Sequence, residues 1–550
     1  MISDVLNNRW LAGGLGLVLW LTGCGKKSAP APARVSTNAP PAAVKILKPS
    51  VAQELFEPGP LRTIQIQVVG DALKQLERND RQYARATFRE GNDVIQNVGV
   101  HVKGSAGSRR GFGDNPALTV HFDKFVPDQK WRGLEKIHLN NSVQDPSKLT
   151  ENICGEMFRQ AGVPAARAGN VRVKVNGKDL GVYVIKEGFD RVFLKQYYQN
   201  TKGNLYDGGF CHDIDQPCEK ISGNASKDQP ELKALFAAAQ EPDLAKRWSR
   251  MERLLDMDRF ITFCALEVMM YDWDGYVLKP NNYKLYCDPD SGKITFFPHG
   301  MDQMFWEPKF PIQPGMNGFV SRALVETPEG KRRYLARMTE LTTNVLRVDV
   351  ITNRINAYAA PIHAALAERN AGWARDYDGQ AQRLRDLIAA RASYLKQQLL
   401  FAPPKALTFQ GGAVQVKDWQ SEYDTNVALR APGQGANGKD ALRIVAGEST
   451  AASWRARVLL PAGRYRFEAS VRTAGVVAMR DEVGEGAGIR ISGARQRREN
   501  KLSGDTPWQK LQYEFDVAAP NDEVVMVCEL RANKGQVWFD ADSLRLVRVK

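Results

Sequence analysis

Three polar residues in the middle of the chain have the types and the order that phosphoryl transfer requires. Asp274 lies in a short polar loop, Asn282 follows it, and Asp302 comes just after a hairpin predicted at residues 283–297. The reaction needs a carboxylate beside the acceptor hydroxyl and oxygen ligands that hold Mg²⁺ on the nucleotide phosphates. Asp and Asn are also common in turns, so a purely structural role for Asp274 is the alternative. The hypothesis is that Asp274 is catalytic and that Asn282 and Asp302 bind Mg²⁺ or Mn²⁺.

The elements that must position these residues can be predicted from hydrophobic periodicity. Alternation predicts strands, and the Asn176-Gly177 pair predicts a hairpin turn. Asp145-Pro146-Ser147 is typical of a helix start, and an apolar face follows it. The predicted strands before the loop are residues 63–68, 98–103, 118–122, 171–175 and 180–184, and helices are predicted over residues 226–271 and 328–400.

The character of the sequence changes after Phe401-Ala402-Pro403-Pro404, where the last predicted helix stops. Short runs of β-forming residues separated by Gly-rich turns follow, and they predict an all-β sandwich or jelly roll over residues 405–550. Four tryptophans of this region could stack on sugars, but packing in a core is the favoured interpretation, because sandwiches need large apolar residues. They are Trp419, Trp454, Trp508 and Trp538.

The N-terminus has the pattern of an export signal. Arg9 precedes an apolar run from Trp10 to Leu21 that is too short to span a bilayer stably. Leu21-Thr22-Gly23-Cys24 resembles a lipobox, in which Cys24 is lipidated and becomes the mature N-terminus; the alternative is an ordinary signal peptide. Residues 1–24 are therefore expected to be a signal peptide and residues 25–60 a disordered tether. The protein is expected to be exported and held by a lipid anchor at a membrane, on the periplasmic face or the cell surface.

The charge, the cysteines and the histidines of the sequence restrict the kinds of partner and of metal or disulfide site that we expect. The formal charge of +14 is spread along the chain without a nucleic-acid motif, so we expect no nucleic-acid partner. Cys211 and Cys218 are close in a loop-like stretch and form a candidate disulfide in an oxidising compartment. The six histidines show no metal-ligand spacing with Cys, which argues against a structural zinc site.

Several short stretches, in order over residues 62–400, are similar to the CotH (spore coat protein H) kinase family. The resemblance implies a two-lobed fold like that of atypical protein kinases, with ATP as co-substrate and transfer of its γ-phosphate to Ser or Thr of a protein in the envelope or outside the cell. The similar stretches are Val102-Lys103-Gly104-Ser105, Leu139-Asn140-Asn141-Ser142, Asp145-Pro146-Ser147, Gly162-Val163-Pro164-Ala165, Leu180-Gly181-Val182-Tyr183, Gly203-Asn204-Leu205-Tyr206, Trp273-Asp274-Gly275-Tyr276 and Pro298-His299-Gly300-Met301-Asp302.

The resemblance places Asp274 at the catalytic position and Asn282 and Asp302 at the metal-binding positions. Further nucleotide-binding candidates are Lys103, which follows a strand, and Glu151, which could pair with Lys103 as the helix glutamate of protein kinases pairs with its lysine. Surface roles are the alternative for both. Lys186 and Glu187 end a strand where a nucleotide hinge could lie.

The expected fold class is therefore α+β, with a kinase-like domain over residues 61–402 followed by the β-sandwich. Two departures bear on activity, since many relatives have Asp where Gly300 stands and Lys where Asn115 stands. The alternative function is a non-catalytic surface scaffold or adhesion lipoprotein with a glycan-binding, carbohydrate-binding-module-like β domain.

Overall fold

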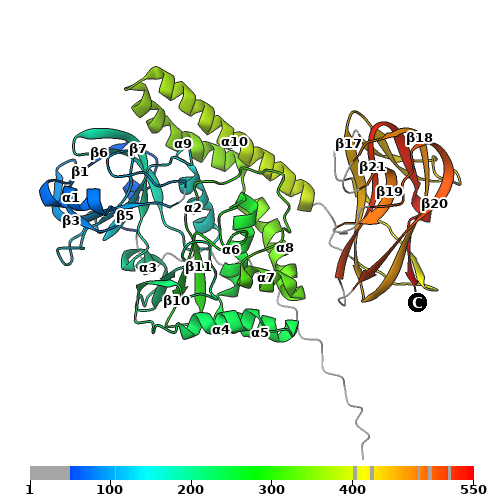
Figure 1. The fold of residues 1–550 in the computed structure, drawn as a ribbon, viewed down its shortest axis with the longest axis horizontal. Coiled ribbons are helices and arrows are strands. Elements are labelled where there is room, and N and C mark those ends of the chain that lie inside the picture. Colours follow the sequence, from blue (N-terminus) through cyan, green and yellow to red (C-terminus); the bar gives the residue numbers. More distant parts are fainter. Residues whose placement is uncertain are drawn as a thin grey trace, which may run out of the picture. The chain divides into compact units, whose positions relative to one another are not determined.

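Seven strands within residues 62–187 form a closed β-barrel in the computed structural model (Figure 1). The structure describes residues 50–105, 107–399, 405–421, 427–480, 484–492, 498–517 and 522–549. The barrel strands follow the order β1-β2-β3-β4-β5-β7-β6, and a parallel β1–β6 pair closes the ring. Alternation sends one set of side chains into an apolar core that includes Val100, Leu118 and Ile185. The strands are β1 (Arg62–Gln67), β2 (Ala84–Glu90), β3 (Asp93–Lys103), β4 (Ala117–His121), β5 (Lys136–Asn140), β6 (Ala168–Val175) and β7 (Lys178–Glu187).

Three helices accompany the barrel: α1 (Gly70–Arg78), α2 (Thr150–Gln160) and α3 (Arg191–Tyr197). Helix α2 begins at Thr150, later than the predicted start, but Asp145 still serves it. The Asp145 carboxylate accepts hydrogen bonds from the backbone N–H groups of Leu149 (2.9 Å) and Thr150 (3.0 Å). The predicted turn of the β6–β7 hairpin is confirmed, with Asn176 and Gly177 both at positive φ.

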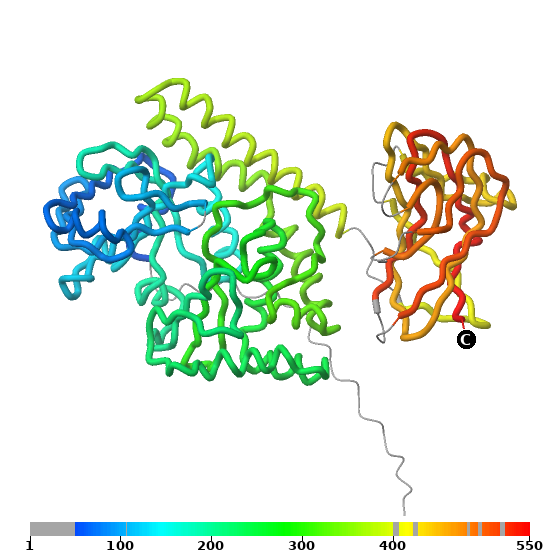
Figure 2. The backbone as a smooth tube through the Cα atoms, in the orientation of Figure 1, coloured from blue at the N-terminus to red at the C-terminus, as the bar shows by residue number. Residues whose placement is uncertain are grey.

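A four-stranded sheet and seven helices complete this part of the chain up to residue 399. The sheet has the order β11-β10-β8-β9, and its β10–β11 hairpin is the one predicted from the sequence. Helices α9 and α10 lie antiparallel, side by side (Figure 2). The elements are β8 (Asn204–Asp207), β9 (Glu219–Ser222), α4 (Pro230–Ala239), α5 (Leu244–Leu254), α6 (Met257–Met270), β10 (Tyr283–Cys287), β11 (Ile294–Pro298), α7 (Phe319–Glu326), α8 (Pro328–Asn344), α9 (Val348–Ala367) and α10 (Ala371–Leu399).

The segment before β1 corrects one prediction. The disordered tether was expected to reach residue 60, yet Leu55 and Phe56 are buried, and the carbonyl of Leu55 lies so close to Gly169 that a Cβ there would be 2.3 Å from it. Apolar burial of Leu55 and Phe56 therefore anchors residues 53–56. The predicted signal peptide, Cys24 and residues 25–49 of the tether lie outside the described residues.

Residues 405–549 are β-rich, as predicted, and have an apolar core of their own. The long strands β18 and β21 each pair with several neighbours, and register shifts interrupt both. Within the described helices, none is long and apolar enough to cross a membrane. The strands are β12 (Lys405–Ala406), β13 (Ala413–Gln415), β14 (Gln420–Ser421), β15 (Ala428–Ala431), β16 (Ala441–Ala446), β17 (Thr450–Leu460), β18 (Gly463–Ala478), β19 (Gly486–Ile491), β20 (Gly504–Val517), β21 (Asp522–Asp540) and β22 (Arg545–Val549).

Candidate functional site

The loop between α6 and β10 brings Asp274 and Asn282 into direct contact. The Asn282 amide nitrogen donates hydrogen bonds to the Asp274 carboxylate (3.0 Å) and to the Asp274 carbonyl (3.1 Å). Glu267 on α6 ties the loop down by accepting from the backbone N–H groups of Tyr276 (3.2 Å) and Val277 (2.7 Å). The predicted catalytic side chain and one predicted metal ligand, Asn282, therefore lie in one loop that Glu267 holds in place.

The segment after β11 returns to this loop and carries Asp302. The His299 backbone N–H donates to the Asn282 carbonyl (3.0 Å), and Gly300 adopts φ 63° beside the Asn282 side chain. A Cβ at position 300 would lie 2.7 Å from the Asn282 side chain. Glycine is therefore needed for this arrangement of Asn282, which accounts for the absence of an acidic residue at position 300.

Buried carboxylates crowd the site. Burial and the negative charges of Glu151 and Asp145 raise the pKa of Asp302 to about 7. Asp272, which the sequence interpretation missed, is 2% exposed, and one of its carboxylate oxygens has no hydrogen-bond partner. Burial, with Glu267, Asp274 and Asp302 nearby, raises its pKa well above the usual range. Such a cluster is destabilised by its own charge and gains by binding a cation.

The donor set fits Mg²⁺ held jointly with a nucleotide. Across the described residues, no three His, Cys, Asp or Glu side chains form a complete metal cage. Mg²⁺ normally uses one or two carboxylates and takes its remaining oxygen ligands from phosphates and water. Asp302 and the Asn282 amide oxygen supply protein ligands of that kind.

The barrel wall brings two lysines to the same site, but it pairs them differently from the prediction. Lys186 is fully buried and forms an ion pair with Glu151 on α2 at 2.7 Å. Lys103 donates instead to the neutral Asn140 side chain at 2.6 Å, so the expected Lys103–Glu151 pair is wrong. Burial and the charge of Lys186 lower the pKa of Lys103 to about 8. Lys103 is the cation of this wall that has no carboxylate partner among the described residues.

Glu187 does not face the site, which corrects a third prediction. Its carboxylate accepts from Arg167 (2.7 Å and 3.1 Å) and from the Gln196 amide (2.6 Å). Successive residues of a strand point to opposite sides, so Lys186 and Glu187 cannot both reach the nucleotide region.

A third lysine, missed in the sequence, lies beside the catalytic candidate. The Lys279 ammonium is 3.1 Å from the Asp274 carboxylate and 5.0 Å from the centre of the Trp273 ring. The sequence feature that could have identified Lys279 is its position in the loop between Asp274 and Asn282. The ion pair places a partly exposed cation beside Asp274, since the Lys279 side chain is 42% exposed.

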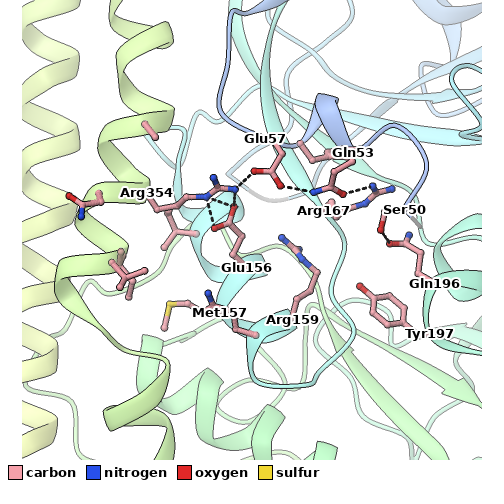
Figure 3. Close-up of a pocket in the computed structure, with 17 residues that line it drawn as sticks. Ser50, Gln53, Glu57, Glu156, Met157, Arg159, Arg167, Gln196, Tyr197 and Arg354 are labelled. Carbon is pink, nitrogen blue, oxygen red and sulfur yellow. Dashed lines mark hydrogen bonds and ion pairs between the residues drawn. The ribbon is translucent and has the colours of Figure 1, made fainter. Parts of the chain in front are cut away.

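A cavity of about 560 Å³ lies against the other side of α2 (Figure 3). Glu156 pairs there with Arg354 of α9, and Arg159 points into the cavity. None of the predicted site residues within the described part of the chain lines it. Helix α2 therefore separates this cavity from the site at Glu151.

The structure also shows the surroundings of the two cysteines of the candidate disulfide and of Asn115, where many relatives have Lys. Cys211 and Cys218 are both free thiols, the first exposed and the second buried, so the predicted pairing is wrong for this fold. Asn115 accepts a hydrogen bond from the Tyr183 hydroxyl (2.5 Å), and its carbonyl accepts from Asn141 (2.7 Å). Asn115 thus supports a loop.

Comparison with known proteins supports the family resemblance. A family model described as CotH kinase protein matches residues 100–395. The inner spore coat protein H of Bacillus subtilis is 26% identical over 198 residues, which cover 32% of this chain and 52% of that protein. Invasin CotH3 of Rhizopus delemar is 25% identical over 192 residues, which cover 30% of this chain and 31% of the invasin. The chain thus matches about half the length of the first relative and a third of the second.

Solved structures match about a quarter of the chain, and the match is weak. A family 61 carbohydrate-binding module solved with β-1,4-galactotriose is 17% identical and covers 24% of this chain and 91% of its own, with a TM-score of 0.19. A family 6 module of a laminarinase from Zobellia galactanivorans is 14% identical and covers 25% and 98%, with a TM-score of 0.16. These similarities identify no ligand. The family model spans more than half of the chain and includes every residue of the candidate site, and the chain belongs to the CotH kinase protein family.

Proposed function

We propose that this protein is an exported, Mg²⁺- and ATP-dependent protein kinase that phosphorylates Ser or Thr of envelope or extracellular proteins. The observation that carries the proposal is the juxtaposition of the Asp274–Asn282 pair, half-buried Asp302 and the Lys186–Glu151 ion pair around one site. Family membership supports the kinase assignment. The kinase-like two-lobed description of residues 61–402 is part of the same proposal.

Each side chain has a definite task in this scheme. Asp302 and the Asn282 amide oxygen would hold Mg²⁺, which neutralises negative charge on the β- and γ-phosphates. Lys103 has a free charge for the phosphates, and Glu151 holds Lys186 in place for the same purpose. Asp274 orients the acceptor hydroxyl and takes its proton, the hydroxyl oxygen bonds to the γ-phosphorus, the bond to the bridging oxygen breaks, and ADP leaves with that electron pair.

The pH dependence of nucleotide binding tests the metal ligand. Mg²⁺-dependent binding of a non-hydrolysable ATP analogue should strengthen as pH rises from 6 to 8. Asp302, with its pKa near 7, must lose its proton to bind the cation, so affinity should fall by up to about tenfold for each pH unit below 7. Calorimetry at each pH measures the change.

Asp302→Asn provides the control. In this variant the nucleotide phosphates still titrate, but the side chain of residue 302 does not. Weak binding at every pH, with a flatter profile than wild type, is expected. A wild-type profile in the variant would exclude Asp302 as a ligand. Absence of nucleotide binding by the wild-type chain would contradict the kinase proposal and favour the non-catalytic scaffold.

Membrane anchoring is a separate part of the proposal. Cys24 is the acceptor in the predicted lipobox, so Cys24→Ser should move the protein from the membrane fraction to the soluble fraction. Cys211→Ser, which changes an exposed thiol in the folded body, should leave the fractionation unchanged. Retention of the Cys24→Ser protein on membranes after a high-salt wash would contradict the lipid anchor.

A further inference from the structure

The outward face of the C-terminal β region carries an alternating row of arginine and tryptophan. Arg443 on β16 and Arg472 on β18 are both directly opposite Trp538 on β21. Trp508 on β20 lies on the other side of Arg472. These four residues, the Arg–Trp row, cross four neighbouring strands and end on β20, which pairs with β18.

The row is held by stacking. The Arg472 guanidinium is 4.3 Å from the Trp538 ring centre and 5.3 Å from that of Trp508, and the Arg443 guanidinium is 5.4 Å from Trp538. Trp538 is 7% exposed, and its indole N–H donates to Gln434 at 2.7 Å. A guanidinium held over an indole ring can still donate its N–H groups to other partners.

Both arginines can donate further hydrogen bonds. No hydrogen bond or carboxylate partner of Arg472 is found within the described residues, and its buried Nε is unsatisfied. Arg443 donates to the neutral Gln536 side chain, from Nε at 3.0 Å. A guanidinium without a carboxylate, held rigidly at a surface, is a recognition group for an external anion.

Two acids of the same face, Glu468 and Glu514, are already paired with basic side chains, and Asp540 accepts a hydrogen bond from the backbone N–H of Ala436 (3.1 Å). Glu468 accepts from Arg466 (2.9 Å), Lys510 (3.0 Å) and Arg545 (2.8 Å). Glu514 pairs with Arg464 at 3.0 Å. Positive charge therefore remains in excess around the row, and an acidic ligand is favoured over a neutral one.

We propose that the Arg–Trp row binds an acidic polysaccharide through the carboxylates of its uronic acid units. Arg472 and Arg443 donate to the carboxylates, and half-buried Trp508 offers its edge-strand surface to the apolar side of a sugar ring. Nucleic acid is disfavoured, because Trp538 has no free ring face for base stacking. The site does not depend on phosphoryl transfer.

The test is calorimetric titration of the full chain with tetragalacturonate and with its fully methyl-esterified form, which has the same α-1,4-linked backbone but no negative charge. Tetragalacturonate should bind at least about tenfold more tightly. Arg472→Gln and Trp508→Ala should each weaken that binding by about tenfold or more, and Arg472→Lys should give an intermediate loss, because it keeps the charge without the planar fork. Arg464→Gln, on the same face but paired with Glu514, should change it less than twofold.

Folding and kinase function are monitored separately. All variants should keep the wild-type thermal transition to within a few degrees and unchanged nucleotide binding, so a loss of glycan affinity cannot be assigned to unfolding or to the other site. Equal affinity for the neutral oligosaccharide would overturn the proposal. Single-stranded DNA or dextran sulfate binding as tightly as tetragalacturonate, with the same variants affected, would also overturn it and identify a general polyanion surface.

Discussion

Asp274→Asn should slow phosphoryl transfer by about 10²–10⁴-fold while Mg²⁺-dependent nucleotide binding stays close to wild type. The amide keeps the size of the side chain and can still contact Asn282, which now donates at 3.0 Å to the carboxylate. It cannot accept a proton from the acceptor hydroxyl. Transfer of label from γ-labelled ATP to the protein itself or to casein measures the rate, and calorimetry with a non-hydrolysable analogue measures binding.

Asp290→Asn is the matched control, because Asp290 lies in the exposed turn of the neighbouring β10–β11 hairpin and bonds to Asn200 at 2.8 Å. It should retain wild-type rates. Wild-type activity in Asp274→Asn would show that the aspartate has a structural role only. Equal losses in binding and in rate would indicate that Asp274 serves as a metal ligand rather than as a base.

Lys186→Met should destabilise the protein by about 3–5 kcal/mol and abolish measurable nucleotide binding. The Lys186–Glu151 pair is almost completely buried, so removing the ammonium leaves an unpaired buried carboxylate close to the other carboxylates of the site. The double variant Lys186→Met/Glu151→Gln removes both charges and should recover most of the stability without recovering binding. Denaturant unfolding and calorimetric titration give the two quantities.

The chain supplies its own control in the next residue. Glu187→Gln breaks another buried ion pair, with Arg167 at 2.7 Å, on the opposite side of β7. Comparable destabilisation with normal nucleotide affinity is expected. If the Lys186/Glu151 double variant binds nucleotide like wild type, the pair is only structural and Lys103 must suffice for the phosphates.

Local sequence determined the elements around the site. Alternation of side chains with a period of two residues is enough to define the strands of the β6–β7 and β10–β11 hairpins. Asn176 and Gly177 are residues that readily adopt the positive φ angles of the β6–β7 turn. The order of Asp274, Asn282, hairpin and Asp302 also required no tertiary information. These features depend on neighbours in the chain, and such neighbours are visible in a sequence.

The tertiary structure alone decided which of these side chains contact each other. Glu151 contacts Lys186 rather than Lys103 because the packing of α2 on the barrel selects which strand it faces, and no spacing encodes that choice. The burial of Asp272 and the Arg–Trp row likewise depend on segments distant in sequence, the row on four strands between residues 441 and 540. The sequence therefore determined which chemical groups are present and on which helices, strands and loops they lie. Packing determined which charged side chains contact each other. The pKa values and the binding surfaces follow from those contacts.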